Sequence, residues 1–152
     1  MITRPTTDVL IGDCCRELID AILPGLTDET LKLRLIMAET VLRNAAVRAA
    51  HEIAWMSEET AALLEYAGQV AARHGGEPLD AALAAARAHP ADSLHLGDVT
   101  DRYEQAGRAF AAALAAAQEA GAADLVAAAR ELLRDRIATE KQIMATYAVV
   151  GH

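Results

Sequence analysis

Two charged residues near the C-terminus, Arg136 and Glu140, are the first candidates for chemistry, because they interrupt an apolar stripe. At about 100° of rotation per residue, a helix over 129–150 gathers its apolar side chains on one broad face, and both charges fall within that face. The two residues are four positions apart, so one helical turn brings them together. Burying either charge alone is costly, so each requires a partner on its own helix, on another helix or on a ligand.

Three interpretations of this pair stay open. It is a structural ion pair that fixes the position of the helix, an arginine that reaches to the rim of the core, or part of a ligand site. In the third case Arg136 clamps a small anionic ligand and Glu140 orients it, because the guanidinium fork binds carboxylate or phosphate at two points. His51 or Tyr103 then supplies a proton-transfer or hydrogen-bonding group. This interpretation requires the last helix to face the helix that carries His51.

The segment that begins at Thr27 carries a second anomaly, because it has two apolar sides. One side is a normal core face, formed by Leu31, Leu35, Ala38, Val41, Leu42, Ala45, Ala49, Ile53 and Met56. The opposite side carries a second seam, formed by Leu33, Ile36, Met37, Val47 and Trp55. A polar line runs along this seam and consists of Thr40, Asn44 and His51. Such a helix is central in a bundle or offers one seam to a second chain.

The polar line also allows more than one interpretation. Its members are hydrogen-bonded core residues, the floor of a small-ligand pocket beside Trp55, or the strip that gives a dimer interface its specificity.

Signatures of known catalytic sites are absent from the sequence. It contains no GxGxxG, Walker loop, GxSxG, HExxH or EF-hand loop. The di-iron helical bundles need Glu-x-x-His pairs, and no glutamate of this chain has a histidine three positions later. We therefore expect no cofactor and no metal site, and we favour a protein that is not an enzyme.

Composition limits the class of protein and its partners. The chain has 152 residues, of which 53% are hydrophobic but only 3% aromatic, and alanine dominates. Close-packed helices suit this composition, because alanine is the best helix former. The net charge of −8 argues against nucleic acid and anionic membranes as partners. No signal peptide and no membrane-spanning run is predicted. The adjacent Cys14 and Cys15 are expected to be reduced thiols of a cytoplasmic protein.

Capping residues and helix breakers predict the elements that must position these residues. Ser57, followed by Glu58 and Glu59, is interpreted as a new N-cap, although 27–74 as one helix or two stays open. The predicted fold is all-α, an up-and-down bundle of four long helices plus one or two short ones, in a single domain over 1–152. The expected helices are 7–23, 27–56, 57–74, 78–89, 98–120 (capped by Asp98) and 122–152.

The stretches "RPTTDVL", "LID", "LPGL" and "LKLRLIMAETVLRNAAVR" together resemble the opening of a poorly characterised bacterial helical family. Arg4 and Pro5 match its opening, and Arg34 matches the arginine of its second helix. The chain departs from the family where Ala38 and Glu39 replace an expected asparagine, and where "AAHEI" replaces an Arg-Glu-Leu. Members are encoded beside, or fused to, aminoglycoside-phosphotransferase-like kinases and acyl-CoA dehydrogenases. The resemblance implies an accessory protein to a kinase-like enzyme in acyl or small-molecule metabolism.

The sequence thus favours a non-enzymatic binding or accessory module. It self-associates as a homodimer, or docks on a partner enzyme, through the second seam. The alternative is a protein or enzyme that holds a small anionic ligand inside the bundle, around Arg136 and Glu140. The candidate ligand-binding residues are Arg136, Glu140, Thr40, Asn44, His51, Trp55 and Tyr103.

Overall fold

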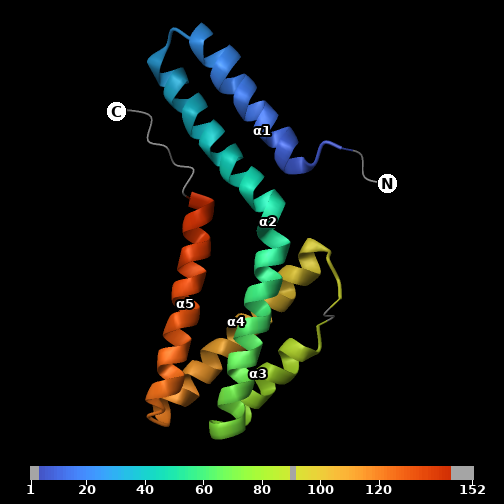
Figure 1. Ribbon diagram of the computed structural model, residues 1–152, viewed down its shortest axis with the longest axis vertical. Helices are drawn as coiled ribbons and strands as arrows, with labels where there is room; N and C mark the ends of the chain where they lie inside the picture. The colour runs from blue at the N-terminus through green and yellow to red at the C-terminus, as the bar shows by residue number, and fades with distance from the viewer. Residues whose placement is uncertain (1–3, 90–91, 145–152) are drawn as a thin grey trace. The chain divides into compact units, whose positions relative to one another are not determined.

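The computed structural model describes residues 4–89 and 92–144, and helices form most of this part of the chain (Figure 1). A π-helical turn, η1 (Leu18–Ile22), and a 3-10 turn, η2 (Leu23–Gly25), follow the first helix. The residues described contain no strand, which confirms the predicted all-α class. The predicted extension of the last helix over 145–152 lies outside them. The α-helices are α1 (Thr7–Glu17), α2 (Glu29–His74), α3 (Glu77–Arg87), α4 (Leu96–Glu119) and α5 (Ala123–Met144).

The chain divides into two compact units, which are described separately. Unit 1 comprises Met1–Glu52 together with Glu140–His152, and unit 2 comprises Ile53–Thr139. The residues of α2 and of α5 are thus shared between the units.

The helix α2 corrects the prediction of separate helices over 27–56 and 57–74, because it is continuous across Ser57. The Ser57 hydroxyl donates to the carbonyl oxygen of Ile53 at 2.7 Å, one turn earlier in the same helix. A serine inside a helix satisfies its hydroxyl in this way, whereas an N-cap serine accepts from backbone N–H groups that follow it. The acidic residues after Ser57 therefore lie in the middle of a helix.

Two helix starts also differ from their predictions. Asp28, rather than Thr27, caps α2, because its carboxylate accepts two backbone N–H groups of the first turn at 2.7 and 3.2 Å. The N-cap position of α4 is His95, so Asp98 lies within the first turn of α4. There its carboxylate accepts the Ser93 hydroxyl at 2.5 Å.

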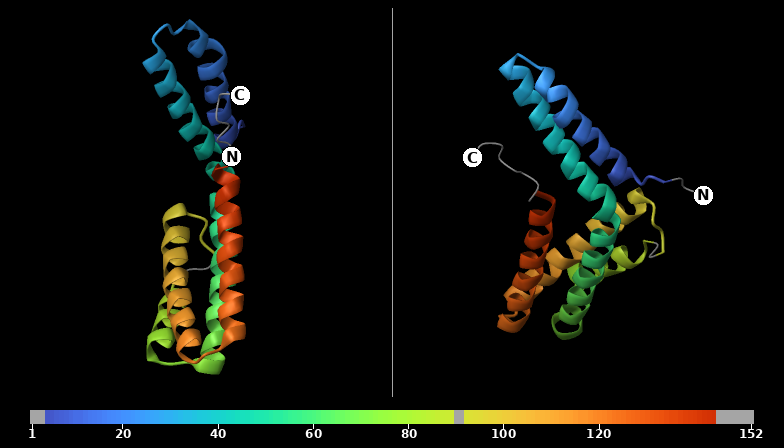
Figure 2. Two further views of the ribbon diagram at one scale, coloured as in Figure 1. Left: turned by 90° about the vertical axis from the view of Figure 1, so that its left-hand side faces the viewer. Right: turned by 45° about the horizontal axis from the view of Figure 1, so that its top comes forward.

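Unit 2 contains the main hydrophobic core, to which α2, α3, α4 and α5 all contribute. α3 packs against α4 (Figures 1 and 2). The Tyr66 and Phe110 rings are 5.3 Å apart and supply most of the aromatic volume. Elsewhere alanines let the helices approach closely, as the composition predicts. The buried core residues are Leu63, Tyr66, Ala67, Val70, Leu79, Leu83, Ala106, Ala109, Phe110, Ala113, Ala117, Leu125 and Ala129.

An ion pair fixes α5 beside the second half of α2. Arg73, in the last turn of α2, donates to Asp124, in the first turn of α5, at 2.6 Å. This hydrogen bond lowers the pKa of the Asp124 carboxyl. The two helices run antiparallel in unit 2, since the end of one lies at the start of the other. The half of α2 that faces α5 here is the part predicted as a separate helix over 57–74, whereas His51 lies in unit 1.

Gly121 makes the turn that brings α5 back along α4. Its φ of 64° lies in the left-handed region, which glycine adopts without steric cost. The Gly121 N–H donates to the Gln118 carbonyl at 3.0 Å, and the Ala122 N–H donates to the Ala117 carbonyl at 2.9 Å. These two bonds form a Schellman motif, which satisfies carbonyl groups that the helix end leaves open.

In unit 1, α1 lies along the first half of α2 (Figures 1 and 2). Cys15 is buried, and its thiol approaches the Glu39 carbonyl at 3.8 Å. Burial raises the pKa of the Cys15 thiol. The Glu39 side chain is also buried and pairs with Arg43 one turn later at 2.9 Å.

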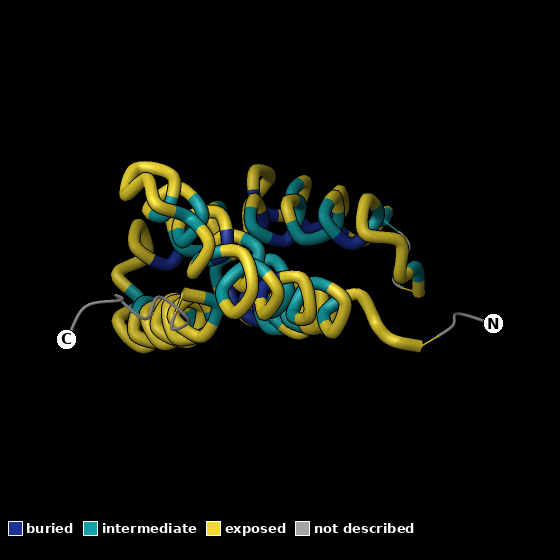
Figure 3. The backbone as a smooth tube through the Cα atoms, turned by 90° about the horizontal axis from the view of Figure 1, so that it is seen from above, coloured by how far each residue is buried: buried dark blue, intermediate teal, exposed yellow. Residues whose placement is uncertain are grey.

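This packing corrects the predicted core face of the second helix. Leu31 and Val41 were expected in the core, and both are exposed. Figure 3 shows the buried residues as short dark blue segments among intermediate and exposed ones. In the first half of α2 the buried position is Glu39, whose methylenes are apolar and whose carboxylate is paired with Arg43.

Candidate functional site

Arg136 lies on the inner face of α5, just past the residues of this helix that pack in the core of unit 2. Leu125 and Ala129 precede it on the same side of α5 and are buried, and Leu132 is half-buried. The Arg136 side chain is 47% exposed. The apolar stripe therefore continues past the end of the core, so the guanidinium stays accessible to water and avoids the cost of full burial.

The partner of Arg136 across the helices is Glu59. Arg136 Nε is 3.8 Å from Glu59 Oε1, and the Tyr103 hydroxyl donates to Glu59 Oε2 at 2.9 Å. The Arg136 guanidinium carbon is 6.0 Å from the centre of the Tyr103 ring, within the range of a cation–π contact. Three helices, α2, α4 and α5, thus meet at one carboxylate.

A surface pocket opens beside this cluster, and we call it the α2–α5 pocket. Its volume is about 200 Å³. Leu63 and Leu132 supply apolar lining, and Trp55 supplies an aromatic wall. The residues that line it are Trp55, Glu58, Glu59, Ala62, Leu63, Leu132, Asp135, Arg136 and Thr139.

The charges of the α2–α5 pocket are unequal. Glu58, Glu59 and Asp135 place three carboxylates around it, against the single guanidinium of Arg136. Arg136 already faces Glu59. Glu58 and Asp135 are exposed, and their carboxylates form no ion pair with another described residue. An approaching ligand therefore meets a pocket of net negative charge.

The Glu59 carboxylate has its neighbours on two other helices. The Glu59 carboxylate has both oxygens engaged, by Tyr103 and by Arg136, so it is held in place as a structural acceptor. Among the described residues, no cluster of His, Cys, Asp and Glu is suited to hold a metal ion. Over the same part of the chain, none of the helices is long and apolar enough to cross a bilayer.

The structure brings together three of the predicted ligand residues. Arg136 and Tyr103 share Glu59, and Trp55 lines the pocket next to them. The other four, which belong to unit 1, are Thr40, Asn44, His51 and Glu140.

The sequence interpretation missed Glu59. The sequence places it in the acidic first turn of a predicted helix, where a solvated charge is expected. Its position four residues after Trp55 and four before Leu63, on the side of α2 that faces the core, was the available signal.

Unit 1 carries a second candidate surface, an exposed apolar stripe of Leu33, Met37 and Val41 on α2. These side chains are 59%, 62% and 62% exposed. Their spacing of four residues places them on one side of the helix. Leu33 and Met37 belong to the predicted second seam, and Val41 to the predicted core face. Other exposed large apolar side chains of unit 1 are Val9, Leu10, Ile22 and Leu31.

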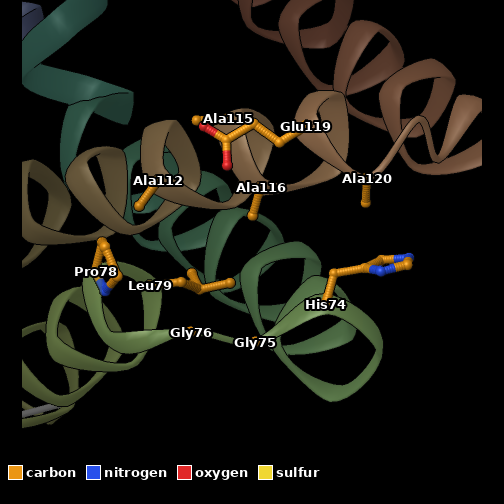
Figure 4. Close-up of a pocket in the computed structure, with 10 residues that line it drawn as sticks. All are labelled: His74, Gly75, Gly76, Pro78, Leu79, Ala112, Ala115, Ala116, Glu119 and Ala120. Carbon is orange, nitrogen blue, oxygen red and sulfur yellow. The ribbon is translucent and has the colours of Figure 1, made fainter.

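A second hollow lies where α2 turns into α3, beside the end of α4 (Figure 4). Its volume is about 380 Å³, and most of its lining is alanine and glycine, with Leu79 between α3 and α4. His74 and Glu119 are its titratable groups, and their side chains point in different directions in Figure 4. A binding site needs polar groups that converge, so the α2–α5 pocket is the stronger candidate.

Comparison with known proteins gives no match: no family model, no curated protein and no solved structure is similar to the chain.

Proposed function

We propose that the protein is a non-enzymatic binding module that self-associates through the apolar stripe of Leu33, Met37 and Val41. The observation that carries this proposal is the exposure of three large apolar side chains in succession on one side of α2. Exposed apolar side chains that lie next to one another are typical of an interaction site. Thr40 and Asn44 lie beside the stripe on the same helix, where they suit the polar strip of such an interface.

A second copy is the occupant that fits the stripe best. The three residues are spaced symmetrically about Met37, so an antiparallel twofold contact sets Leu33 of each copy against Val41 of the other. Each apolar member then has an apolar counterpart. Arg34, which borders the stripe, meets position 40 of the other copy rather than a second Arg34, so like charges are kept apart.

Substitution of Met37 by lysine tests the proposal. The wild type is expected to have twice the 16.1 kDa mass of one chain in sedimentation velocity, and Met37→Lys is expected to have the mass of a single chain. A buried unpaired ammonium at the twofold axis explains the loss. Leu94→Lys is the matched control, because Leu94 is an exposed apolar residue of unit 2.

Monomeric wild type at all concentrations, or a Met37→Lys dimer as stable as that of the wild type, would contradict self-association. Circular dichroism of both variants shows whether the helices are retained.

A second candidate function is ligand binding in the α2–α5 pocket, and the proximity of Arg136, Tyr103 and Trp55 favours it. A module that both dimerises and holds a small ligand fits an accessory role beside a metabolic enzyme. The resemblance of the first third of the chain to proteins encoded beside kinase-like enzymes supports this role. The free thiols of Cys14 and Cys15 are consistent with a cytoplasmic location.

A further inference from the structure

We draw no further inference here: the strongest candidate, the hollow where α2 turns into α3 beside the end of α4, is lined mostly by alanine and glycine, and nothing in the described part of the chain shows what would occupy it.

Discussion

At the scale of single residues, Glu59 and Tyr66 are the most informative side chains. They differ in whether a residue of another helix forms a hydrogen bond to their polar atoms. Glu59 accepts from Tyr103 and faces Arg136, so one carboxylate links three helices of unit 2. Tyr66 is the opposite case, because its hydroxyl is buried and has no hydrogen-bond partner among the described residues. Burial raises the pKa of Tyr66, which keeps the phenol neutral.

These two tyrosines give a matched pair of substitutions. Tyr66→Phe removes an unsatisfied hydroxyl, so the free energy of unfolding is expected to stay the same or rise by up to about 1 kcal/mol. Tyr103→Phe removes the donor to Glu59 and is expected to lower the free energy of unfolding by about 1 kcal/mol. Urea unfolding followed by circular dichroism measures both. A Tyr66→Phe protein that is less stable than Tyr103→Phe would show that these hydrogen-bond assignments are wrong.

Arg136 shows how much about a single side chain can be predicted from the sequence. Its place in an apolar stripe indicated a charge that needs a partner, and the structure provides one. The sequence left open a partner on the same helix, on another helix or on a ligand. Only Glu140 could be named, because spacing reveals only neighbours three or four positions away on the same helix. Glu59 is distant in the chain, so its proximity depends on which helices pack together, and no local pattern encodes that choice.

At the scale of helices, the ends and interruptions decide the topology. Ser57 illustrates the difficulty, because a serine followed by two glutamates is the usual start of a helix, yet its hydroxyl bonds backward and α2 continues. The apolar and acidic residues on both sides of Ser57 are compatible with one continuous helix and also with two separate helices. By contrast, Gly121 and the short α3 after Gly76-Glu77-Pro78 followed from breaker residues whose conformations leave few alternatives.

Two glycine substitutions separate the roles of turn and helix glycines. Gly121→Ala is expected to lower the free energy of unfolding by about 1 kcal/mol, because an L residue is strained at a φ of 64°. Gly107→Ala, inside α4, is expected to raise it by about 0.5–1 kcal/mol. Apart from the nearby backbone of α4 itself, no atom of the described residues lies within 4 Å of a methyl group there, and alanine favours the helix.

Thermal unfolding of the two glycine variants and the wild type checks the signs. Equal shifts in the same direction would mean that Gly121 is not required for the turn between α4 and α5.

At the scale of the whole molecule, the composition predicts the all-α class, and the proposed self-association rests on the exposed surface of unit 1. A chain with a net charge of −8 repels its own copy, so a dimer has to be held by apolar contact and is strengthened when salt screens the charges. The apolar stripe of Leu33, Met37 and Val41 can supply that contact. The sequence divided these residues between a core face and a second seam, because periodicity alone does not say which face a neighbouring helix covers.

The most direct test of this account is a charge exchange across the proposed twofold axis. Leu33→Lys and Val41→Glu chains are each expected to be monomeric alone, because each places a charge against an apolar side chain. Mixed in equal amounts, they are expected to form a heterodimer in native mass spectrometry, since the lysine of one chain then faces the glutamate of the other. A mixture that stays monomeric while both chains remain helical, or single variants that dimerise like the wild type, would contradict the proposed interface.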